Sequence, residues 1–178
     1  IREFGKTFKS FVEINFIEQP QFRMILSDGY SPKDIIRNMT RIDPGLTFTA
    51  GNTLIFFDEI QAYPDITTSL KFFAIDGSYD VICSGSLRGV NYKQIESVSV
   101  GYKMDYEMYS LDFEEFLWAK GYDDSLREEL LDHMVSVRPL SEATYVTLNR
   151  LFLDYVILGG MPEVVKRYIG TDSFSGIN

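Results

Sequence analysis

The sequence predicts an α/β protein, with a parallel sheet flanked by helices and followed by a purely helical region. The first observation is the run from Thr53 to Phe57, whose five residues are apolar or β-branched without alternation. Such a run is typical of a strand that is buried on both faces of a parallel sheet. The second is that strand-like and helix-like stretches alternate before this run and after it. The third is that helical spacing dominates after Asp124.

The elements of the sheet region can be predicted in order. A strand is expected at residues 11–16 and a short helical stretch at 19–26. Ser31 should cap the next helix, because its hydroxyl can accept hydrogen bonds from first-turn amides and Pro32 suits the first helical position. After the strand at 53–57, Asp65 should cap a helix that runs to about Ala74, with Leu70 and Phe73 in the core.

The chain continues with a strand at 79–83 that ends in Ser84-Gly85-Ser86. Residues 100–109 suggest a last strand of mixed polarity, and a helix should follow with Ser110 or Asp112 as its cap.

Three further helices are expected at 125–137, at 141–158 and from Pro162 onward, with Gly159-Gly160 ending the second. We expect the apolar residues of the second helix to face inward, namely Leu148, Leu151, Phe152, Tyr155 and Val156.

Composition limits the classes of function. The 178 residues include 17 basic and 26 acidic ones, which gives a net charge of -9 and argues against bulk attraction to nucleic acid or anionic membranes. No run of eighteen apolar residues is present, so no membrane span is expected. The single cysteine, Cys83, lies within a predicted strand, which excludes a disulfide framework and points to the cytoplasm.

Two carboxylates, Asp58 and Glu59, directly follow the most apolar strand. They should emerge at the carboxyl edge of the sheet, where open α/β sheets bind their ligands. In a nucleotide hydrolase the first acid of such a pair holds Mg²⁺ and the second polarises the attacking water, and adjacent strand residues point to opposite faces. The alternative is that acids end buried strands simply because the chain returns to water there.

The tripeptide Gly5-Lys6-Thr7 spells the end of a phosphate-binding loop. Only three residues separate Thr7 from the strand at 11–16, whereas the lysine of such a loop must open a long helix. We therefore interpret the tripeptide as the C-terminal end of a helix.

Several segments in the right order resemble an AAA+-like ATPase family of the P-loop NTPase superfamily. Residues 58–61, Asp-Glu-Ile-Gln, resemble its Walker B segment, and 159–162, Gly-Gly-Met-Pro, match its helical lid. Residues 110–118 resemble the family signature Leu-Ser-Phe-Glu-Glu-Phe-Leu. Tyr102 departs from the pattern, because many members carry arginine at this position, and Lys103 is only a weak substitute.

The resemblance implies a partial AAA+-like ATPase core at 1–122, a helical lid at 123–170 and a linker-like tail at 171–178. It also implies that the N-terminal strand and the phosphate loop (Walker A) lie upstream of Ile1, so the fold is that of a P-loop NTPase with this part missing. The intact protein would be a cytoplasmic hydrolase that binds ATP and hydrolyses it with Mg²⁺. This fragment alone would be inactive.

The resemblance also implies roles for single residues. Asp58 is the acid on the side of the metal and of the bound nucleotide, and Glu59 is the acid that activates water. Ser86 or Ser84 occupies the sensor position, where a polar side chain on the strand next to the phosphate loop helps to orient that water. Without its context, Ser-Gly-Ser would be interpreted as a turn.

Two alternatives remain open at the level of the sequence. A sheet that lacks its central strand has unpaired backbone groups, so the chain could be a non-catalytic interaction module, or a degenerate NTPase scaffold, that self-associates. A metal-dependent nuclease would use Asp58, Glu59 and Asp65, but no lysine completes the usual set and the net charge opposes DNA.

Overall fold

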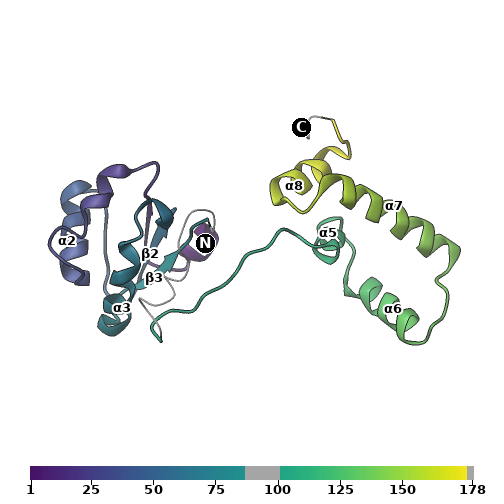
Figure 1. The fold of residues 1–178 in the computed structure, drawn as a ribbon, viewed down its shortest axis with the longest axis horizontal. Helices are drawn as coiled ribbons and strands as arrows, with labels where there is room; N and C mark the ends of the chain where they lie inside the picture. The colour runs from purple at the N-terminus through teal and green to yellow at the C-terminus, as the bar shows by residue number, and fades with distance from the viewer. Residues whose placement is uncertain (87–100, 176–178) are drawn as a thin grey trace. The chain divides into compact units, whose positions relative to one another are not determined.

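The computed structural model describes residues 1–86 and 101–175, which form two compact units, Ile1–Asp105 and Tyr106–Asn178. Figure 1 shows the sheet with its helices in the first unit and an all-helical arrangement in the second. Each unit is described on its own.

A three-stranded parallel sheet forms the centre of the first unit, which confirms the predicted α/β class. The strands β1 (Ser10–Asn15), β2 (Thr53–Asp58) and β3 (Asp80–Cys83) lie in the order β1-β2-β3. The first five residues of β2 are buried, as the unbroken apolar run predicts, and exposure begins at Asp58. All three strands therefore direct their carboxyl ends to one edge of the sheet.

One face of the sheet packs on helices α2 (Pro32–Ile42) and α3 (Ile66–Asp76) and on the 3₁₀ helix η1 (Pro20–Met24). The core there contains alternate residues of the strands together with side chains of these helices, among them Ile14, Phe16, Phe57, Met39 and Phe73. The ring of Phe57 stacks on that of Phe16 and meets Phe73 edge-on.

The helix boundaries follow from local chemistry. The Ser31 hydroxyl accepts a hydrogen bond from the Asp34 amide, and Pro32 begins α2, as predicted. Asp65 does precede α3, but its side chain makes no capping hydrogen bond, and the helix continues past Ala74 to Asp76. The short helix α1 (Arg2–Gly5) ends just before Lys6, which confirms that Gly5-Lys6-Thr7 closes a helix.

The second unit consists of α5 (Phe113–Ala119), α6 (Asp124–Val135), α7 (Glu142–Leu158) and α8 (Pro162–Thr171). Asp112 caps α5 in a complete capping box with Glu115, and Ser141 caps α7. The core of this unit gathers buried side chains of α5, α7 and α8, namely Phe116, Leu117, Leu148, Leu151, Leu158, Val165 and Tyr168.

The prediction of a last strand at residues 100–109 is wrong for its described part. Residues 101–109 do not form a strand; Gly101 has a φ of 85°, and Met104, Tyr106 and Met108 are exposed. Residue 100 lies outside the described residues. Strand propensity depends on packing against neighbouring strands, so residues of mixed polarity do not form a strand through propensity alone.

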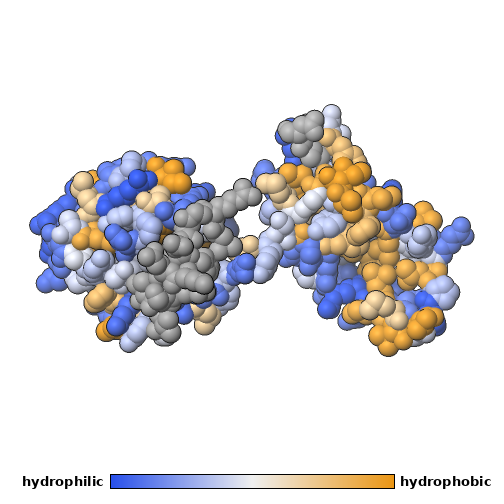
Figure 2. All heavy atoms as spheres, viewed as in Figure 1, coloured by the Kyte–Doolittle hydropathy of each residue, from blue (hydrophilic) through white to orange (hydrophobic). Residues whose placement is uncertain are grey.

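The prediction for α7 is partly wrong. Leu148 and Leu151 are buried and Tyr155 is half-buried, but Phe152 and Val156 are exposed. The helix is apolar over most of its circumference, and α5 and α8 pack on only one side of it. Figure 2 shows the resulting gathering of hydrophobic residues on the surface of the helical unit. Within residues 1–86 and 101–175, no helix is long and apolar enough to cross a membrane.

Two leucines of α7 test this packing. We predict that Leu151→Ala, at a side chain that is 1% exposed, lowers the free energy of unfolding of the helical unit by about 2–5 kcal/mol, because it removes buried contacts and leaves a cavity. Leu153→Ala is the matched control, because Leu153 is 53% exposed, and it should cost less than about 1 kcal/mol. Urea unfolding followed by Trp118 fluorescence measures both. Equal losses would contradict the assignment of the buried face.

Candidate functional site

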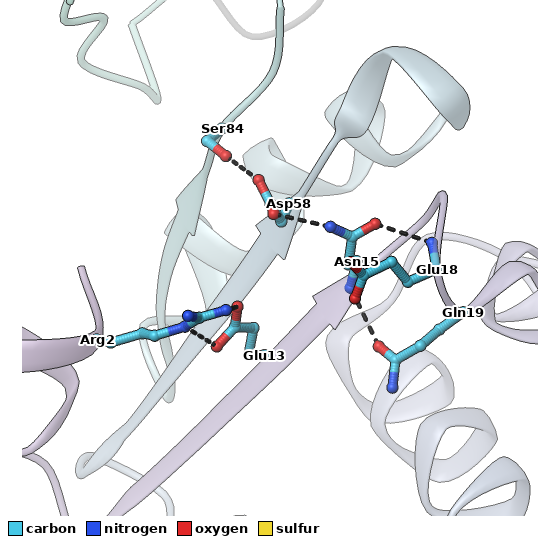
Figure 3. A network of polar contacts seen from close by, with 7 residues as sticks. All are labelled: Arg2, Glu13, Asn15, Glu18, Gln19, Asp58 and Ser84. Atoms are coloured by element: carbon cyan, nitrogen blue, oxygen red, sulfur yellow. Dashed lines mark hydrogen bonds and ion pairs between the residues drawn. The ribbon is translucent and has the colours of Figure 1, made fainter. Parts of the chain in front are cut away.

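Asp58 is the last residue of β2 and lies at the carboxyl edge of the sheet, as predicted from the sequence. Its carboxylate is half-buried and is held from both neighbouring strand ends (Figure 3). Oδ2 accepts a hydrogen bond from Nδ2 of Asn15 at 2.9 Å, and Oδ1 accepts one from the Ser84 hydroxyl. A carboxylate with a donor on each oxygen has a fixed orientation.

Asn15 is itself fixed by the turn that follows β1. Its side-chain oxygen accepts hydrogen bonds from the amides of Ile17 and Glu18, at 2.9 and 3.0 Å. The side chain of Gln19 accepts from the Asn15 amide at 3.1 Å. Asn15 was not predicted as a site residue, although a polar residue at the end of the first strand is a usable signal. Its pairing in register with Asp58 becomes visible only in the sheet.

A second polar contact joins α1 to β1 nearby (Figure 3). The Arg2 guanidinium donates to Glu13, with Nε 2.9 Å from Oε2 and Nη2 2.8 Å from Oε1. The hydrogen bond and the charge of Glu13 raise the pKa of Arg2, and the charge of Asp58 adds to this effect. Arg2 is therefore a permanent positive charge within electrostatic reach of Asp58. This ion pair could not be predicted from the sequence.

Glu59 leaves the strand in a left-handed backbone conformation, with φ 55° and ψ 44°. β2 ends at Asp58, so the strand alternation that was expected to separate the two carboxylates does not extend to Glu59. A short 3₁₀ turn, η2 (Ile60–Ala62), follows at once. The Glu59 carboxylate accepts a hydrogen bond from the side-chain amide of Gln61 through Oε2.

The two serines after β3 take different positions. The Ser84 hydroxyl contacts Asp58, and its backbone amide donates to the Phe57 carbonyl at 2.9 Å. Ser86 is exposed, and its backbone amide donates to Oε1 of Gln61 at 3.2 Å. The structure thus brings together Asp58 and Ser84, and it links Glu59 to Ser86 through Gln61.

The oxygen atoms of Asp58 and Ser84 are suitable ligands for a Mg²⁺ ion that is also bound by a nucleotide. The Asp58 carboxylate and the Ser84 hydroxyl are oxygen ligands of the kind that Mg²⁺ prefers, and each oxygen of Asp58 keeps a lone pair beyond its one hydrogen bond. Over the described ranges, no three His, Cys, Asp or Glu side chains form a group that could hold a metal by themselves. The remaining ligands would have to be phosphate and water oxygens, as is usual for Mg²⁺.

The same observation weakens the nuclease alternative, which needs Asp65 as a third ligand. Asp65 is exposed at the start of α3 and does not join Asp58 and Glu59 in such a group.

Comparisons with known proteins found one family. A family model described as an AAA domain matches residues 1–117, which is more than half of the chain. No curated protein and no solved structure matches the chain.

Cys83 tests how tightly β3 is packed beside the site. Burial raises the pKa of its thiol to about 12 from an ordinary value of 9.0, so at pH 8 the thiolate should be about a thousandfold rarer than in an exposed cysteine. We predict that a thiol reagent labels the native chain at least about a hundredfold more slowly than the urea-unfolded chain.

The control for this labelling is Ser175→Cys in a Cys83→Ser background, because Ser175 is exposed. It should react at similar rates with and without urea. Cys83 is half-buried by its exposed surface, and a native rate equal to that of the control would show that the packing of β3 does not protect its thiol.

Proposed function

Because the chain belongs to the AAA domain family, we propose that the full-length protein binds ATP and hydrolyses it with Mg²⁺. The observation that supports this most directly is the Asp58 carboxylate, which Asn15 and Ser84 hold at the carboxyl edge of a parallel sheet. This edge is where open α/β sheets bind ligands.

In this proposal Asp58 is the acid on the metal side. Bound Mg²⁺ would neutralise negative charge on the nucleotide phosphates. The role of the protein is to keep the acid in place, and hydrogen bonds from Asn15 and Ser84 do this. Preorganised groups need no rearrangement when the ligand arrives.

Glu59 is the proposed general base. It accepts a proton from the water whose oxygen bonds to the γ-phosphorus, while the bond from that phosphorus to the β,γ-bridging oxygen breaks and ADP leaves. Glu59 is half-buried and begins the turn after β2, so it is adjacent to Asp58 but belongs to a different local conformation. This arrangement supports separate tasks for the two acids.

Of the two candidate sensors, Ser84 is favoured over Ser86. The hydroxyl of Ser84 contacts Asp58 directly, whereas the backbone of Ser86 contacts Gln61. Because the Ser84 hydroxyl is hydrogen-bonded to Asp58, the acid on the metal side, it can respond to bound nucleotide and help to orient water.

The assignment of core (1–122), lid (123–170) and tail (171–178) is also a proposal, as is a cytoplasmic location. The compact units divide at Asp105, and α5, which lies within the proposed core range, packs against α7 and α8 in the helical unit.

An interaction module is the second candidate, and the exposed edges of the sheet favour it. Within the described residues, β1 and β3 each pair with β2 only. Unpaired strand edges can pair with another chain. This candidate would be preferred if the protein self-associates in sedimentation experiments and Mg-ATP leaves its melting temperature unchanged.

Replacing the base tests the proposal. Glu59→Gln in the full-length protein should lower kcat for ATP about 10²–10⁴-fold, because the amide cannot take the proton, while nucleotide binding persists. Phosphate release measures turnover, and the rise in melting temperature with Mg-ATP measures binding.

Glu163→Gln is the matched control, because Glu163 is an exposed residue of α8. It should leave kcat unchanged. Full turnover by Glu59→Gln would refute Glu59 as the base, and a wild-type protein without turnover would refute the ATPase proposal.

A further inference from the structure

The side-chain amide of Gln61 lies between the Glu59 carboxylate and the backbone that follows β3. Its Nε2 donates to Oε2 of Glu59, and its Oε1 accepts from the Ser86 amide at 3.2 Å. One residue thus links the end of β2 to the end of β3. We call this pair of hydrogen bonds the Gln61 bridge.

The orientation of the Gln61 amide is determined by its partners. A backbone amide can only donate, so the side-chain oxygen must face Ser86. An ionised carboxylate can only accept, so the NH₂ group must face Glu59. The reversed amide would lose both hydrogen bonds, because its NH₂ group would face the Ser86 N–H and its oxygen would face the Glu59 carboxylate.

Gly85 shows how closely this backbone approaches the bridge. A Cβ atom at position 85 would lie 2.8 Å from Oε1 of Gln61 and 2.9 Å from Cγ1 of Ile60. Both are far shorter than an ordinary contact, and both neighbours are side-chain atoms that can move. An alanine at this position would therefore displace the Gln61 amide and also press on the Ile60 side chain.

The bridge is built on a fixed backbone frame. The Ile60 amide donates to the Ser84 carbonyl at 3.1 Å, and the Ala62 amide donates to the Glu59 carbonyl at 2.9 Å. Glu59 is held in its left-handed conformation between these contacts. The frame sets the Cα positions of Glu59 and Gln61, and the bridge then selects the rotamer of the Glu59 side chain.

We propose that Gln61 is the positioning residue for Glu59, an inference that rests on the proposed role of Glu59 as base. Gln61 binds one carboxylate oxygen and leaves the other for water. A carboxylate on a flexible side chain in a half-exposed turn would otherwise sample several rotamers, and misplacement of a catalytic group lowers the rate. A purely structural role of Gln61 would affect folding but not turnover by the folded protein.

The bridge can be tested without activity, in the chain itself, by ¹H–¹⁵N NMR. Gln61→Leu should shift the Ser86 backbone amide resonance, and Gly85→Ala and Glu59→Gln should each shift the Gln61 side-chain NH₂ resonances. Gln21→Leu and Gly170→Ala are matched controls, because Gln21 is exposed and a Cβ at Gly170 meets nothing within 4 Å. Unchanged Ser86 and Gln61 signals in the test variants would overturn the bridge.

Kinetics of the full-length protein test the positioning role. Gln61→Leu should lower kcat about tenfold and change KM for ATP less than about twofold, because the lost interaction serves the transition state. Gln61→Glu separates the two halves of the bridge, since glutamate can still accept from Ser86 but cannot donate to Glu59. It should be as slow as Gln61→Leu. Recovery of wild-type kcat in Gln61→Glu, or a kcat above wild type in Gln61→Leu, would overturn the role.

The outcomes separate this inference from the proposed function. If the wild type hydrolyses ATP and depends on Glu59, but the Gln61 variants match it, the function stands and the positioning role fails. If the wild type has no turnover, the function fails and the positioning role fails with it, whether or not the NMR data support the bridge.

Discussion

The burial of β2 between two parallel neighbours is the constraint on which the first unit depends. Residues 53–57 are buried, so their backbone groups pair with β1 or β3, and polar side chains can appear only where the strand ends. Asp58 is the first position at which this becomes possible. The same pairing places Asn15 opposite Asp58. It also brings Ser84, the residue directly after β3, into contact with Asp58. The polar cluster is thus a direct result of strand register.

Features that depend on neighbouring residues in the chain could be predicted from the sequence. The apolar run of β2, the Ser31-Pro32 start of α2 and the end of α1 at Gly5-Lys6 all follow from propensity, capping or spacing. Asp58 belongs to this group, because the end of a buried strand can be recognised locally. The parallel arrangement followed from the alternation of strands and helices.

Features that depend on contacts across the fold could not be predicted. Asn15 gained its importance from the pairing of β1 with β2, which joins residues 43 positions apart. The exposure of Phe152 and the absence of a strand at 101–109 have a similar cause, because apolar or β-prone residues need a partner surface before they pack. The sequence shows that a residue can pack, whereas the fold decides whether anything packs against it.

The glycines at 159–160 and at 85 illustrate how a fold constraint differs from a site constraint. A Cβ at Gly160 would lie 2.1 Å from the Leu111 carbonyl oxygen, and the Gly160 carbonyl accepts from the Leu111 amide at 2.8 Å, so backbone meets backbone and neither can yield. Gly159, with a φ of 68°, makes the turn that allows this approach. The Gly-Gly pair is therefore required to hold α5 against the end of α7. At Gly85 the two nearest neighbours are side-chain atoms, Oε1 of Gln61 and Cγ1 of Ile60, so a larger residue there would meet side chains before backbone. What Gly85 preserves is the place of the Gln61 amide, which makes its small size a property of the candidate site.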